Sequence, residues 1–92
     1  MTPIGTADDV FDATFKVLVS PGAGRLRFLP PKRFSRGFEV VEAGQPIASL
    51  EQSRGDVLVR APFAGRVSAV MGLEGEPVQP GHPVVAIEPA EH

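Results

Sequence analysis

The sequence predicts an all-β domain, a flattened barrel or sandwich built from two similar halves. Ten prolines and ten glycines recur at short intervals, which is typical of many short strands joined by tight turns. No window of ten or more residues shows the 3.6-residue apolar period of an amphipathic helix. Residues 39–51 also resemble residues 76–88 without gaps, sharing Glu, Val, Gly, Pro and Glu at matching places. Such self-similarity indicates a chain made of repeated units.

A second pair of similar segments, residues 21–26 and 62–67, precedes the first pair in each half. The distance in sequence from the first similar segment to the second is four residues longer in the first half (residues 25 to 39) than in the second half (residues 66 to 76). The extra residues fall in segment 29–37, where Pro30 and Pro31 remove two backbone donors and stop a strand ladder. We therefore expect an inserted loop there.

Short runs rich in β-branched, aromatic or alternating apolar residues predict the strands. These runs are residues 15–19, 25–28, 47–50, 57–59, 67–71 and 84–87. Pro80 followed by Gly81 predicts a type II turn, because the third turn position needs a positive φ. Gly44 occupies the same place in the first half.

Length and composition limit the function. Ninety-two residues make one domain, which we expect over residues 15–89, with a flexible tail at 1–14 and a short C-terminal tail at 90–92. The net charge of −2 argues against a dedicated nucleic-acid binder. The start of the sequence lacks a leader pattern, and no apolar run approaches the ~20 residues of a membrane span. We therefore expect a cytoplasmic protein without nucleic-acid or membrane contacts.

The sequence offers little chemistry of its own. The absence of cysteine excludes disulfides and thiolate chemistry. No histidines or carboxylates have the spacing of metal ligands, and no Ser/His/Asp set or phosphate-binding loop stands out. His82 is expected to be a solvated turn residue. We therefore predict no catalytic residue, no metal site and no enzyme activity.

Residues 61–67 and 74–84, with their first-half counterpart 44–51, resemble biotinyl/lipoyl carrier domains. The family motif reads a-P-x-x-G-x-V and then x-G-x-x-V-x-x-G-x-x-L after the modified lysine, and the resemblance covers roughly residues 17–88. It implies a barrel-sandwich hybrid of two four-stranded sheets related by a pseudo-two-fold axis. It also implies a lysine at the tip of the central hairpin, where biotin or lipoate is attached.

That lysine is missing from this sequence. Counting back seven residues from Ala61 leads to Arg54, flanked by Ser53 and Gly55. Family members have Met-Lys-Met or Asp-Lys-Ala there. Because an arginine guanidinium is protonated at any ordinary pH, it does not replace the nucleophilic amine. The only lysines are Lys16 and Lys32, neither at the attachment position, so we expect no cofactor.

Two regions are candidates for binding a partner protein. Arg54 is either a solvated charge at the tip or a contact residue. The inserted loop holds Lys32, Arg33, Phe34 and Arg36, and resembles in position the projecting thumb of some carboxylase biotin carriers. Basic residues near aromatics can bind an acidic partner or single-stranded nucleic acid. A solvated loop that packs two phenylalanines, Phe28 and Phe34, on the barrel is the favoured alternative.

The function predicted from sequence is an unmodified biotinyl/lipoyl-like module that binds another protein. It would be a subunit or regulator of a carboxylase or acyl-transfer complex. One alternative is a carrier modified atypically on Lys32 or Lys16. Another is a structural adaptor, because such barrels also occur in membrane-fusion and efflux proteins.

Overall fold

Over residues 15–90, which the computed structural model describes, the chain forms nine strands and no helix. The strands are β1 (Lys16–Val19), β2 (Gly24–Phe28), β3 (Phe34–Ser35), β4 (Phe38–Val41), β5 (Pro46–Glu51), β6 (Val57–Arg60), β7 (Gly65–Val70), β8 (Pro77–Val78) and β9 (Pro83–Pro89). All six strands predicted from sequence are present. The predicted N-terminal tail and residues 91–92 lie outside the described residues. Because residues 15–90 contain no helix, the described structure has no helical membrane span.

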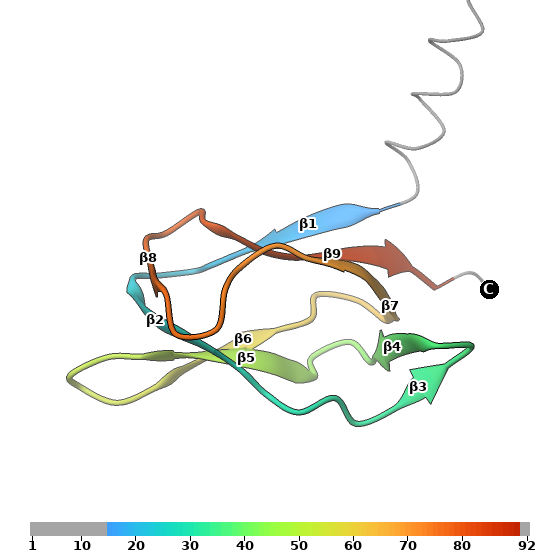
Figure 1. Ribbon diagram of the computed structural model, residues 1–92, viewed down its shortest axis with the longest axis horizontal. Helices are drawn as coiled ribbons and strands as arrows, with labels where there is room; N and C mark the ends of the chain where they lie inside the picture. The colour runs from blue at the N-terminus through green and yellow to red at the C-terminus, as the bar shows by residue number, and fades with distance from the viewer. Residues whose placement is uncertain (1–14, 91–92) are drawn as a thin grey trace, which may run out of the picture.

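The strands form two antiparallel sheets that face each other without closing into a barrel (Figure 1). One sheet has the order β1-β9-β7-β4-β3 and the other β6-β5-β2-β8. Strands β2 and β5 of the first half pair with β6 and β8 of the second, while β7 and β9 pair with β1 and β4. The two halves are therefore interlocked, and the predicted barrel-sandwich class is confirmed. The prediction of four strands in each sheet needs one correction, because the inserted loop adds β3 to the first sheet.

The core lies between the sheets and consists of aliphatic side chains. Its largest fully buried members are Leu26, Val41, Leu50, Val59, Val78, Val84 and Ile87. In β2, Leu26 is buried between the exposed Arg25 and Arg27, which confirms the predicted alternation. Full burial of such a side chain contributes roughly 1.5–3 kcal/mol, so this core can hold the two sheets together.

The predicted tight turns have the expected backbone. His82 donates its amide hydrogen to the Gln79 carbonyl at 3.1 Å, and Gly81 between them has φ 87°. Gln45 donates to Glu42 at 3.1 Å around Gly44, with φ 83°. Both are type II turns, and each reverses the chain just before a long strand.

The inserted loop lies at the opposite end of the molecule from the central hairpin. Strand β2 pairs with β5 so that Arg25 faces Glu51, while Phe28 faces Ala48. Since the hairpin loop follows Glu51 and the inserted loop follows Phe28, the two point away from each other (Figure 1). Residues 34–41 form a small hairpin of β3 and β4 there, which we call the distal hairpin.

Candidate functional site

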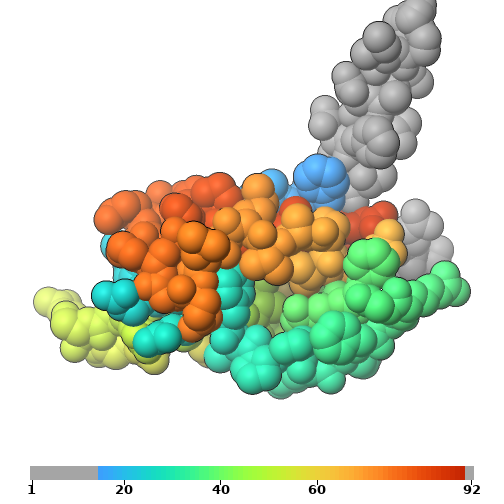
Figure 2. Space-filling view, viewed as in Figure 1, coloured from blue at the N-terminus to red at the C-terminus, as the bar shows by residue number. Residues whose placement is uncertain are grey.

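Residues 52–56 connect β5 to β6 and form the tip of the central hairpin, which we call the tip. Gly55 donates its amide hydrogen to the Gln52 carbonyl at 3.1 Å, so Ser53 and Arg54 are the two central residues of a turn. All five tip residues are exposed. Figure 2 shows the tip projecting beyond the body of the domain.

The local sequence accounts for the shape of the tip. Gly55 has φ 121°, a backbone conformation that L side chains rarely adopt. The Gln52 amide donates to the Ala23 carbonyl at 2.7 Å, which fastens the base of the tip to the loop before β2. The result is a hydrogen-bonded base under an exposed pair, Ser53 and Arg54.

Arg54 has no ion pair within residues 15–90. Its guanidinium therefore stands at the tip as an unneutralised cation. It can donate hydrogen bonds to a carboxylate or phosphate on another molecule. It cannot attack an acyl group, because the guanidinium stays protonated.

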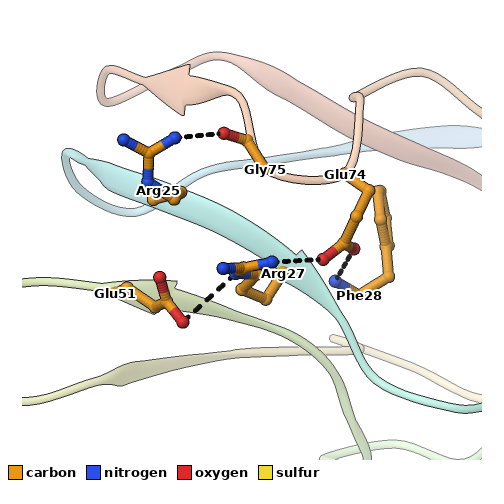
Figure 3. Close-up of polar contacts among 6 residues, drawn as sticks. All are labelled: Arg25, Arg27, Phe28, Glu51, Glu74 and Gly75. Carbon is orange, nitrogen blue, oxygen red and sulfur yellow. Dashed lines mark hydrogen bonds and ion pairs between the residues drawn. The ribbon is translucent and has the colours of Figure 1, made fainter.

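Two arginines of β2, Arg25 and Arg27, contact the loop before β8. Arg25 donates to the Gly75 carbonyl at 2.6 Å (Figure 3). Arg27 lies 3.1 Å from the carboxylate of Glu51 and 3.2 Å from that of Glu74. The pKa of Glu74 is lowered, first by the Phe28 amide that donates to its carboxylate and then by the hydrogen bond from Arg27. The pKa of Arg27 is raised by its hydrogen bonds to the carboxylates of Glu74 and then Glu51. These contacts tie the loop before β8 to β2.

The partner-binding candidates in the inserted loop lie together, at the distal end. Arg33 pairs with Glu42 at 3.2 Å, whereas Lys32 and Arg36 have no ion pair among the described residues. Phe34 is 62% exposed. The expectation that both phenylalanines pack on the barrel is therefore wrong for Phe34, although Phe28 does pack against the core. Arg54 is not part of this group, because it lies at the tip.

Sequence reasoning missed several residues that the fold brings to the distal end. Arg66 in β7 lies 4.3 Å above the Phe38 ring and forms an ion pair with Glu88 of β9. Glu42 follows β4 and pairs with Arg33. Burial raises the pKa of Glu39 in β4. No local motif marks these residues, because the pairings of β4, β7 and β9 join segments far apart in the sequence.

His82 lies in the second of the two type II turns. His82 lies 3.2 Å from the Glu76 carboxylate, so it is a partnered turn residue and not a freely solvated one. Within the described part of the chain, no group of three or more His, Cys, Asp or Glu could hold a metal ion.

Comparison with known proteins agrees with this geometry. A family model described as "Biotin-requiring enzyme", for biotin and lipoyl domains, matches residues 36–87. Among solved structures, a single-chain, multi-domain long-chain acyl-CoA carboxylase is similar, with a TM-score of 0.71 and 22% identity. The match covers 85% of this chain and 8% of the carboxylase. At this identity it shows a shared fold. A search of the curated proteins gave no significant match.

Proposed function

The chain belongs to the biotin/lipoyl domain family, and from this membership we propose that it is an unmodified module that binds another protein. The observation that carries the proposal is the identity of the residue at the tip. Arg54 lies on an ordered turn between Ser53 and Gly55, and the resemblance to carrier domains assigns it the position of their modified lysine. A guanidinium at that position cannot supply the amine needed for an amide bond.

The proposed partner is a larger enzyme complex, of the carboxylase or acyl-transfer kind. Two observations support it. The fold is shared with a segment of an acyl-CoA carboxylase, a protein in which such a domain is one of several. The exposed and unneutralised Arg54 can form charge-assisted hydrogen bonds with an acidic surface. The module would use the tip as a contact and would act in the cytoplasm without catalysing a reaction.

The second candidate function is an atypical carrier acylated on another lysine. Lys16 in β1 and Lys32 in the inserted loop are both exposed, so an enzyme could reach either amine. Neither lies on the tip, and Lys32 is at the opposite end. This candidate requires a ligase that recognises a different part of the domain.

Intact-mass spectrometry after co-expression with a biotin or lipoate ligase and its cofactor tests the proposal. We expect no mass shift on the parent protein. We expect partial acylation of the double variant Ser53→Met, Arg54→Lys, which restores an amine and one flanking methionine. The structure argues for keeping Gly55 in this variant, because its φ of 121° strains any other residue.

The second Ser-Arg-Gly sequence of the chain, residues 35–37, provides a matched control. Arg36→Lys places an amine in the same tripeptide at the distal end, and we expect it to remain unmodified. A biotin or lipoyl mass shift on the parent would overturn the proposal. Peptide mapping to Lys16 or Lys32 would then support the atypical carrier.

A further inference from the structure

The distal end contains a cavity of about 460 Å³. Three arginines from separate parts of the sequence line it: Arg33 before β3, Arg36 in the turn of the distal hairpin, and Arg66 in β7. A volume of this size suits a small molecule or one terminal residue of a peptide, because small-molecule pockets span roughly 300–1,000 Å³.

Both apolar and charged residues line the cavity. Val40, Val41, Ala64 and Pro89 contribute apolar surface. Of the three arginines, Arg33 is neutralised by Glu42 and Arg66 by Glu88, and both glutamates also line the cavity. Three cations and two anions leave one excess positive charge. A singly charged anion balances it, whereas a doubly charged one would meet the two carboxylates.

Arg36 supplies the excess charge from a strained backbone. It has φ 54°, and in the described part of the chain no other non-glycine residue has a positive φ. Asn or Gly fits such a position better, and a larger side chain costs on the order of a tenfold shift in the folding equilibrium. Strained residues of this kind cluster at ligand sites, where the side chain has a use.

We propose that this cavity binds an organic carboxylate carried on a short apolar group. The Arg36 guanidinium would pair with the carboxylate through two parallel N–H···O bonds, and the valine wall would cover the apolar part. The cation of Arg66 stays engaged with Phe38 and Glu88 and bounds the site. This inference does not depend on the proposed function, because the tip lies at the other end of the molecule.

Titration of the full chain followed by two-dimensional NMR tests the proposal. The probes are hexanoate, the neutral hexanamide of the same shape, inorganic phosphate, and a dipeptide with an apolar last residue and a free carboxyl terminus. Hexanoate should shift the amide signals of Val40, Gly65 and Arg66 in a saturable way. Hexanamide should bind at least about tenfold more weakly, since a hydrogen bond to a charged group is worth about that factor or more. Inorganic phosphate should also bind more weakly than hexanoate, because it lacks an apolar group and its second charge would meet Glu42 and Glu88. Tighter binding of the dipeptide than of hexanoate would assign the site to a peptide terminus, and the reverse to a free acid.

Three variants separate binding from folding. Arg36→Asn should weaken hexanoate binding at least about tenfold while the fold is kept or stabilised, because asparagine tolerates a positive φ. Glu42→Gln should tighten binding a few-fold, because it frees Arg33 from its ion pair. The control Lys16→Gln removes a positive charge from an exposed residue that does not line the cavity, and should leave binding unchanged.

Equal binding of hexanoate and hexanamide would overturn the proposal, as would equal binding by the parent and Arg36→Asn. Absence of any saturable shift with hexanoate or the dipeptide would overturn it as well. None of these outcomes affects the mass-spectrometric test at the tip.

Discussion

The tripeptide Ser-Arg-Gly occurs twice, and its two copies adopt different turns. In the distal hairpin, Arg36 and Gly37 have φ 54° and 85°. At the tip, Arg54 has no positive φ, and Gly55 alone has one, at 121°. The same three residues therefore form two backbone conformations at the two ends of the molecule (Figure 1).

Strand register explains the difference. In the distal hairpin, Ser35 pairs with Phe38, so Arg36 and Gly37 must make the turn alone, and a two-residue hairpin turn of type I′ needs positive φ at both. At the tip, the nearest pair is Leu50 with Val57. The unpaired segment between them is longer than the distal turn, so Gly55 can follow the two central turn residues, Ser53 and Arg54. The positive φ is then needed only at Gly55. Tertiary pairing, not the tripeptide, selects the turn type.

Proline at the first central position of each turn should give the largest contrast. Ser53 does not have a positive φ, and no backbone hydrogen bond donated by its amide is present over residues 15–90. We therefore expect Ser53→Pro to change the free energy of unfolding by less than about 1 kcal/mol. Arg36→Pro should cost roughly 2–3 kcal/mol or open the distal hairpin, because proline cannot adopt φ 54°.

Urea unfolding measures the global effect of these two changes. Hydrogen exchange of the Val40 amide, which donates to Arg33 at 3.0 Å, reports local opening of the distal hairpin. If both proline variants unfolded like the parent and protected Val40 equally, the assignment of different turns would be wrong.

Gly81→Ala calibrates the cost of a side chain at positive φ. An added Cβ at Gly81 would meet nothing within 4 Å, and φ is 87°, so the loss is purely conformational. We expect destabilisation of about 1 kcal/mol or more. Urea curves that overlay those of the parent would show that the turn adapts at no cost.

Arg36→Asn should stabilise the fold by about 0.5–1 kcal/mol, since it removes the strained arginine. The matched change Arg54→Asn should alter stability by less than about 0.5 kcal/mol, because Arg54 is exposed and unstrained. Thermal melts of the two variants test the contrast directly. Equal shifts would mean that the arginine at the distal hairpin carries no backbone strain.

Structural features that depend on residues adjacent in the sequence could be predicted from it. Features that depend on the pairing of distant strands could not. Turn chemistry predicted the backbone at Gly81 and Gly44, and alternation predicted the burial of Leu26. The exposure of Phe34 and the cavity beside Arg66 depend on how the inserted loop pairs with β4 and how β4 pairs with β7. Those contacts follow from tertiary register, which no local pattern in this sequence encodes.

The carboxylates of Glu39 in the distal hairpin and of Glu74 in the loop before β8 have pKa values shifted in opposite directions, so pH should distinguish the two regions. Burial raises the pKa of Glu39 above its ordinary value of 4.5, so its charged form is disfavoured in the folded state. The contribution of Glu39 to the free energy of unfolding is therefore most favourable below pH 4.5. This contribution is lost as pH rises through the raised pKa of Glu39. Glu39→Gln should thus stabilise the protein slightly at neutral pH, with the gain disappearing in acid.

Glu74→Gln should show the opposite sign. The lowered pKa of Glu74 stabilises the parent above pH 4.5, and this advantage is lost as pH falls through the lowered pKa. Urea unfolding of both variants and the parent from pH 3 to 7 measures these differences, and parallel pH profiles for the two variants would contradict the assigned environments.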